Sequence, residues 1–116
     1  ENKVLAHPAS VDSIPTSANK EDHVSMGTIA ARKCREVLKN AEYVVSIELL
    51  CAAQAMDLFT NLKAGMGTME AYRKIREHIS HLEEDRVLSQ DINMMQQMVR
   101  EAKIRNAVEN KIGTLN

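Results

Sequence analysis

The pattern of apolar and polar positions divides the chain into an irregular beginning and a helical remainder. Residues 6–19 contain both prolines and show no helical periodicity, which is typical of a loop. From Glu21 onward, apolar residues recur at spacings of three and four, as they do on one face of an α-helix. No segment alternates apolar and polar residues in the manner of a β-strand. We therefore expect an all-α fold in which an irregular loop precedes the helices.

One predicted helix is unusually long. No glycine or proline interrupts residues 28–64, and Gly65 supplies a stop at their C-terminal end. From Val24 to Leu62 such a helix would measure about 58 Å. A compact globule of 116 residues is only about 35 Å across. Other chains, or further parts of this one, must therefore cover the helix.

The middle of this helix is apolar on almost every side. Between Tyr43 and Met56 only Ser46, Glu48 and Gln54 are polar, and such a helix belongs inside a large assembly. A carboxylate in these surroundings must be paired, protonated or at an interface, because burying it bare is costly. A structural ion pair is the default interpretation of Glu48, and contact with an active site is the alternative.

Shorter helices are expected after Gly65. One runs from Thr68 to about Ile79, a polar bend follows at residues 78–85, and Ser89 or Asp91 opens a further helix. We accordingly divide the chain into an active-site-type loop, a long bundle helix and a C-terminal helical segment, at residues 1–23, 24–64 and 65–116.

Charge and hydropathy exclude two classes of partner. The chain has 15 Lys and Arg against 16 Asp and Glu and no basic block, so we expect no nucleic-acid binding. The longest strongly apolar uncharged run, Leu49–Met56, has eight residues, whereas a span of the bilayer needs about 20. We expect no membrane interaction. No signal-peptide pattern opens the chain, and residue 1 is Glu1 rather than Met, which suggests a cut beginning.

The two cysteines indicate a reducing compartment. Cys34 and Cys51 fall 17 residues apart in one predicted helix, or about 25 Å along its axis, too far for a disulfide. Unpaired thiols in an apolar stretch fit a cytoplasmic protein. Their ordinary interpretation is as small buried hydrophobic residues, and reactive thiols are the alternative.

Two polar clusters are candidates for chemistry. The run from Asn19 to His23 is the densest; its acids are ordinarily partners of a helix dipole. The alternative is that Glu21 faces a cleft and binds a cationic or imidazole-bearing ligand or transfers a proton. His78 and His81 have a spacing of three residues, but no third ligand is fixed, so a solvated turn is favoured over a metal site. We therefore expect no metal.

Part of the sequence resembles a known family. Residues 7–27, which read HPASVDSIPTSANKEDHVSMG, closely resemble a characteristic stretch of the histidine ammonia-lyases, members of the aromatic amino acid lyase family. The segments AARK, ELLCAAQA, REH and LEEDR, at residues 30–33, 48–55, 76–78 and 82–86, are similar as well. The resemblance extends over nearly the whole chain but covers only the C-terminal part of a much longer enzyme.

The resemblance implies an enzymatic function, a carbon–nitrogen lyase that eliminates ammonia from L-histidine to give urocanate. The family uses a methylidene-imidazolone electrophile formed from a contiguous Ala-Ser-Gly. The four glycines here follow Met26, Ala64, Met66 and Ile112, so the chain contains no Ser-Gly pair. The resemblance places the precursor in the missing N-terminal part. We therefore expect no cofactor within this chain and no activity from the chain alone.

The resemblance also assigns site residues. Glu21 matches the glutamate that lies near the substrate imidazole in histidine ammonia-lyases and is implicated in binding and acid–base chemistry. Phenylalanine- and tyrosine-type relatives usually have Gln there. Asn19 and His23 flank it as weaker candidates for substrate binding. Lys20 departs from the Gln that commonly precedes the glutamate.

The assembly implied by the resemblance is a homotetramer with a central helical bundle and active sites shared between subunits. The leading hypothesis is therefore a C-terminal fragment of a cytoplasmic histidine ammonia-lyase. Two alternatives remain: a non-catalytic helical assembly module, and a fragment of another aromatic amino acid ammonia-lyase.

Overall fold

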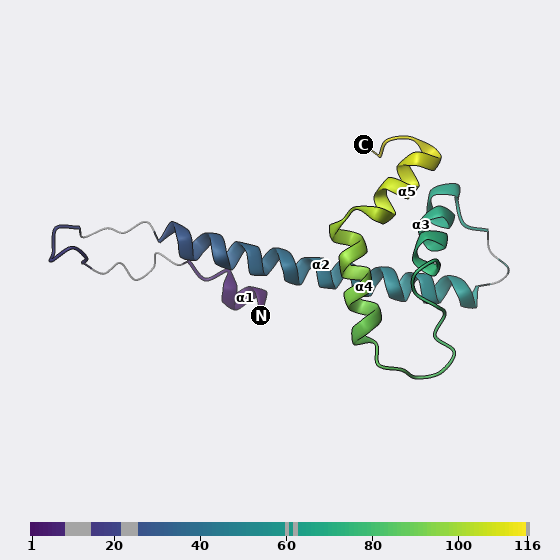
Figure 1. Ribbon diagram of the computed structural model, residues 1–116, viewed down its shortest axis with the longest axis horizontal. Helices are drawn as coiled ribbons and strands as arrows, with labels where there is room; N and C mark the ends of the chain where they lie inside the picture. The colour runs from purple at the N-terminus through teal and green to yellow at the C-terminus, as the bar shows by residue number, and fades with distance from the viewer. Residues whose placement is uncertain (9–14, 22–25, 60, 62, 116) are drawn as a thin grey trace. The chain divides into compact units, whose positions relative to one another are not determined.

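The computed structural model describes residues 1–8, 15–21, 26–59, 61 and 63–115 (Figure 1). They form five helices, which are α1 (Asn2–Leu5), α2 (Gly27–Leu58), α3 (Met66–Arg76), α4 (Ser89–Arg100) and α5 (Lys103–Ile112). Within these residues the only β-type pairing is an isolated bridge between Thr16 and Glu21. The expected all-α class is confirmed. The chain divides into two compact units, residues 1–41 and 42–116.

The long helix is real but shorter than predicted. It begins at Gly27, directly after Met26 in a left-handed conformation with φ 49°, and it ends at Leu58. The prediction that Gly65 stops this helix is wrong. Gly65 instead precedes α3, with extended backbone. The absence of glycine and proline from residues 28–64 therefore did not locate the C-terminal end of the helix. Asn61 favours a turn over a helix interior, and the chain must reverse here to pack α3 against α2.

The first unit is held by side chains of α2. Lys33 Nζ donates to the carbonyl of His7 at 2.8 Å, and Asn40 Nδ2 donates to Asn2 Oδ1 at 2.9 Å. These contacts join the region of α1 to the N-terminal half of α2. Part of the predicted loop at residues 1–23 is therefore helical, in the single turn of α1.

The hydrophobic core lies in the second unit, where α3, α4 and α5 gather on the C-terminal half of α2 (Figure 1). Its buried side chains come from every element of the unit, namely Ala53, Ile75, Ile79, Met95, Met98 and Ile104. The helices approach closely, because a Cβ added to Gly67 of α3 would lie 2.9 Å from Cδ1 of Ile112 in α5. Met95 and Met98 are fully buried in this core.

Short irregular segments set the directions of the last helices. Ala102, with φ 54°, separates α4 from α5, and Gly113, with φ 91°, ends α5. The left-handed residue Ala102 breaks one continuous apolar pattern into two helices, and the positive φ at Gly113 is one that glycine adopts without strain. Residues 103–112 therefore form a helix of their own, which ends at Gly113.

Apolar residues of α2 remain uncovered. Leu38, Val44, Val45 and Ile47 are all exposed, which agrees with the prediction that this chain cannot enclose the helix. Glu48 is exposed too. Water can therefore solvate its carboxylate within this chain, and the buried ion pair of the default interpretation is not required.

The predictions about the two cysteines are only partly confirmed. Cys34 and Cys51 are both free, as predicted, but both are exposed, so their interpretation as buried hydrophobic residues is wrong for this chain. None of the described helices combines the length and the apolar character that crossing a membrane would require.

Candidate functional site

Glu21 lies at the end of a tight turn that begins at Thr16. The Thr16 amide donates to the Glu21 carbonyl at 2.8 Å, and the Glu21 amide donates to the Thr16 carbonyl at 3.3 Å. Between them Ser17, Ala18 and Asn19 have φ values of 51°, 56° and 66°. The left-handed conformation costs about 1–2 kcal/mol for a residue with a Cβ. Consecutive residues held in this way concentrate at functional sites.

The carboxylate of Glu21 is exposed, and its Oε2 accepts a hydrogen bond of 3.3 Å from the Thr16 hydroxyl. A carboxylate open to solvent can receive strong hydrogen bonds from a cationic or N–H-bearing ligand. Glu21 precedes the first residue of α2 by six positions, so it is not in the first turn of that helix. Its interpretation as a partner of the helix dipole is therefore wrong.

The two flanking candidates have different outcomes. Asn19 is exposed in the same turn as Glu21, two residues before it. Its side chain can tolerate the left-handed conformation better than most. His23 lies outside the described residues. The structure thus brings together Asn19 and Glu21 but carries no information on His23.

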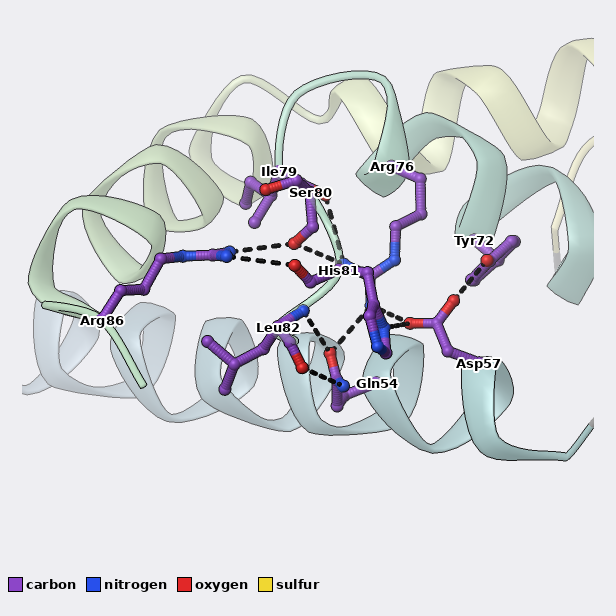
Figure 2. Close-up of polar contacts among 9 residues, drawn as sticks. All are labelled: Gln54, Asp57, Tyr72, Arg76, Ile79, Ser80, His81, Leu82 and Arg86. Atoms are coloured by element: carbon purple, nitrogen blue, oxygen red, sulfur yellow. Dashed lines mark hydrogen bonds and ion pairs between the residues drawn. The ribbon is translucent and has the colours of Figure 1, made fainter. Parts of the chain in front are cut away.

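A second polar cluster, the Asp57 cluster, consists of Asp57, Tyr72, Arg76 and His81 and lies within the second unit (Figure 2). Asp57 Oδ1 accepts the Tyr72 hydroxyl at 2.5 Å. Its Oδ2 lies 2.5 Å from Arg76 Nη2 and 2.9 Å from His81 Nδ1. One carboxylate therefore joins α2, α3 and the segment after α3.

These contacts determine the ionisation of Asp57. Burial by itself would raise the pKa of Asp57, but hydrogen bonds from Tyr72, His81 and Arg76 together lower it to about 2. The hydrogen bond to Asp57, together with burial, raises the pKa of Tyr72. The carboxylate is consequently ionised, with Arg76 as its charged partner.

Neighbouring side chains hold the backbone of residues 79–82 (Figure 2). The amide of Gln54 makes two hydrogen bonds of 3.1 Å with the main chain of Leu82. Arg76 Nη1 donates to the carbonyls of Ile79 and Ser80. Arg86 donates to the carbonyl of Ser80 at 2.9 Å as well. This segment is an irregular but fully anchored connection.

The prediction that His81 lies in a solvated turn is therefore wrong. Its side chain is 35% exposed and contacts Asp57, whereas His78 is exposed and lies 3.2 Å from the carbonyl of Lys74. Sequence reasoning missed the cluster. The only local signal was the Tyr72 and Arg76 pair, four residues apart on one face of α3.

Arg76 of the Asp57 cluster lines a cavity of about 370 Å³, together with residues of α2, the segment after α3 and α4. The lining is mainly apolar, with Ile47, Leu50, Leu58 and Leu82 among its members. Of the described side chains, only Arg76 has a buried nitrogen, Nε, without a hydrogen-bond partner. Both oxygens of Asp57 are already bonded within the protein, so the cluster acts as a clamp between α2, α3 and the segment after α3.

A resident metal has no support in the described part of the chain. No three His, Cys, Asp or Glu side chains gather there in a metal-binding arrangement. His78 and His81 do not converge on a common ligand position, since each is directed to a different partner.

Comparison with known proteins relates the whole chain to one group of enzymes. The histidine ammonia-lyase of Natranaerobius thermophilus is 55% identical over 115 residues, which are 99% of this chain and 23% of that enzyme. The histidine ammonia-lyase of Alkaliphilus oremlandii is 57% identical over 112 residues, covering 97% of this chain and 22% of that enzyme. This chain thus spans less than a quarter of the length of these curated relatives.

Solved structures agree with the sequence comparison. The crystal structure of histidine ammonia-lyase from Trypanosoma cruzi superposes with a TM-score of 0.86 at 41% identity, over 93% of this chain and 21% of that one. The ergothioneine-degrading enzyme ergothionase from Treponema denticola superposes with a TM-score of 0.80 at 39% identity, over 90% and 21%.

The family assignment follows from a match in sequence and in fold. The sequence model described as aromatic amino acid lyase matches residues 1–77, which include the turn at Glu21, all of α2 and the Asp57–Tyr72–Arg76 contacts. The resemblance recognised in residues 7–27 is confirmed, and the chain belongs to the aromatic amino acid lyase family.

Proposed function

We propose that residues 1–116 are the C-terminal part of a histidine ammonia-lyase, an enzyme that eliminates ammonia from L-histidine to give urocanate. The observation that carries this proposal is the 51–57% identity to enzymes of that name across nearly the whole chain. A part of this size contributes binding groups and helices, and the remaining groups come from polypeptide outside these residues.

Glu21 is the proposed contact for the substrate imidazole. It is an exposed carboxylate, and an imidazole N–H is a donor that a carboxylate binds strongly. In an elimination reaction, such a contact fixes the side chain of the substrate while the amino group leaves. Asn19 from the same turn and His23 are proposed as supporting substrate contacts.

The electrophile has to be supplied from outside this chain. The aromatic amino acid lyases use an electrophile formed after translation, and we propose that it is the methylidene-imidazolone made from Ala-Ser-Gly. Residues 1–116 contain no Ser-Gly pair and hence no precursor. When present, the group would activate the amino acid for loss of ammonia. The expected activity of the chain alone is therefore zero.

We also propose that α2 is a bundle helix of a homotetramer whose active sites combine several subunits. The exposed side chains of Leu38, Val44, Val45 and Ile47 support burial of this helix in an assembly. Residues 1–23, 24–64 and 65–116 would then be parts of one larger domain. The two free thiols favour a reducing compartment, and we propose the cytoplasm.

The test is to join residues 1–116 to the upstream part of the Natranaerobius thermophilus enzyme, so that a complete lyase carries this chain at its C-terminal end. Urocanate formation is followed by absorbance. We expect Glu21→Gln to lower kcat/KM for histidine by about a hundredfold or more, as for loss of an acid–base or charged binding group. Glu36→Gln, at an exposed carboxylate of α2, is the matched control. Unchanged turnover in Glu21→Gln would refute the assigned role.

The alternative is a non-catalytic helical assembly module. The exposed apolar side chains of α2 are its support, since they fit an assembly surface whether or not catalysis occurs. A second alternative is another aromatic amino acid ammonia-lyase. Assaying the wild-type fusion with phenylalanine and tyrosine beside histidine separates these cases, because only the histidine enzyme should prefer histidine.

A further inference from the structure

The feature that carries a further inference is the side-chain contact between Thr16 and Glu21. Thr16 Oγ1 donates to Glu21 Oε2 at 3.3 Å. Thr16 is half-buried, whereas Glu21 is exposed. The hydroxyl bonds one carboxylate oxygen, Oε2, and no hydrogen bond to the other oxygen, Oε1, is seen among the described residues.

The backbone enforces this pairing. Thr16 and Glu21 are directly opposed in an antiparallel bridge with hydrogen bonds in both directions. In such a pair the two side chains leave the backbone on the same face, with Cβ atoms about 5 Å apart. The contact is thus built into the bridge and does not depend on a chance rotamer of a long side chain.

The residues between the pair leave the backbone little room to rearrange. Ser17, Ala18 and Asn19 are all left-handed, and the Lys20 amide donates to the Ser17 carbonyl at 3.2 Å. Thr16 is also β-branched, so its χ1 angle is restricted compared with that of serine. Together these features give the hydroxyl a defined place beside the carboxylate.

We propose that Thr16 is a positioning residue for the lyase reaction: its hydroxyl holds Oε2 of Glu21, so that Oε1 is presented to the N–H of the substrate imidazole. This inference rests on the proposed function, in which Glu21 contacts the imidazole. Thr16 itself touches no reacting atom. It reduces the freedom of a flexible, exposed carboxylate before the substrate binds, which favours the productive geometry.

The experiment uses the same complete fusion lyase and a pair of matched substitutions. Thr16→Val removes the hydroxyl and keeps the branched shape, whereas Thr16→Ser keeps the hydroxyl. We expect Thr16→Val to lower kcat/KM for histidine about three- to tenfold, the effect of losing one hydrogen bond. Thr16→Ser should stay within about twofold of wild type. Thr68→Val, at an exposed threonine of α3, controls for the change of residue type.

Coupling to Glu21 separates positioning from a merely structural role. In a Glu21→Ala background, Thr16→Val should cause no further loss, because the hydroxyl then has nothing to hold. An equal loss in both backgrounds would overturn the inference, as would wild-type kinetics in Thr16→Val. If Glu21→Gln lowers kcat/KM and Thr16→Val does not, only the proposed role of Thr16 is refuted. If Glu21→Gln is unimpaired, the proposed role of Glu21 falls, and that of Thr16 falls with it.

Discussion

Tyr72 donates its hydroxyl hydrogen to Oδ1 of Asp57 at 2.5 Å, and this bond ties the middle of α3 to the last turn of α2 (Figure 2). The other oxygen of Asp57 serves Arg76 and His81. The Asp57 side chain is 12% exposed and that of Arg76 is 15% exposed. Solvent therefore screens the Asp57–Arg76 ion pair little, and removing one partner costs more than it would at a surface ion pair because the other charge is left uncompensated.

Replacing Asp57 by Asn should destabilise the second unit by about 2–4 kcal/mol. An amide offers one oxygen and one NH₂ group, so at least one of the three donors around position 57 would face another donor. The buried guanidinium of Arg76 would also lose its counterion. Urea unfolding of the 116-residue chain measures the effect, with Asp85→Asn at an exposed position as the control. Equal stability of the two variants would contradict the clamp.

The same carboxylate should make stability depend on pH in the acid range. Its pKa is lowered from 3.8 to about 2, so the stabilisation is fully present above the unfolded-state value near 4. It is lost as pH falls through the folded-state value near 2. The loss amounts to about 2 kcal/mol. Free energies of unfolding between pH 5 and 2 should therefore fall more steeply for wild type than for Asp57→Asn. Parallel pH profiles would argue against ionised Asp57.

Periodicity was sufficient to locate much of the core. The apolar residues that recur at spacings of three and four in α3, α4 and α5 include Ile75, Met95 and Ile104, and these side chains are buried, because burial of one face is what produces the spacing. The Asp57 cluster has no such pattern. Its members come together only after α3 folds back on α2, at sequence separations of 15, 19 and 24 residues.

The candidate site was found by a different route. Composition favoured a dipole role for Glu21, and only the resemblance of residues 7–27 to a family motif identified it as a candidate. The structure then placed it in a turn ahead of α2. Left-handed Ser17 and Ala18 were not foreseeable, because neither residue type favours that conformation.

The exposed thiols provide a direct probe of what covers α2. Cys34 and Cys51 should both react with a thiol reagent in the chain alone without denaturant, since both are exposed. In the complete fusion lyase, we expect reaction to slow by at least tenfold if α2 is enclosed by the assembly. The Cys34→Ser and Cys51→Ser variants assign the two rates. Equal rates in the chain and in the complete enzyme would contradict enclosure of the helix.

The uncovered apolar residues of α2 should make the isolated chain self-associate. Val44 and Ile47 are 63% and 46% exposed and lie three residues apart, so they are neighbours on one helix face. Replacing both by Lys should shift light-scattering molecular masses toward the monomer, because two charges cannot be buried in an apolar contact. Glu84→Lys, at an exposed position outside α2, controls for the change in net charge. In the complete fusion lyase the double substitution should also prevent formation of the proposed tetramer. A wild-type chain that is already monomeric at high concentration would contradict the prediction.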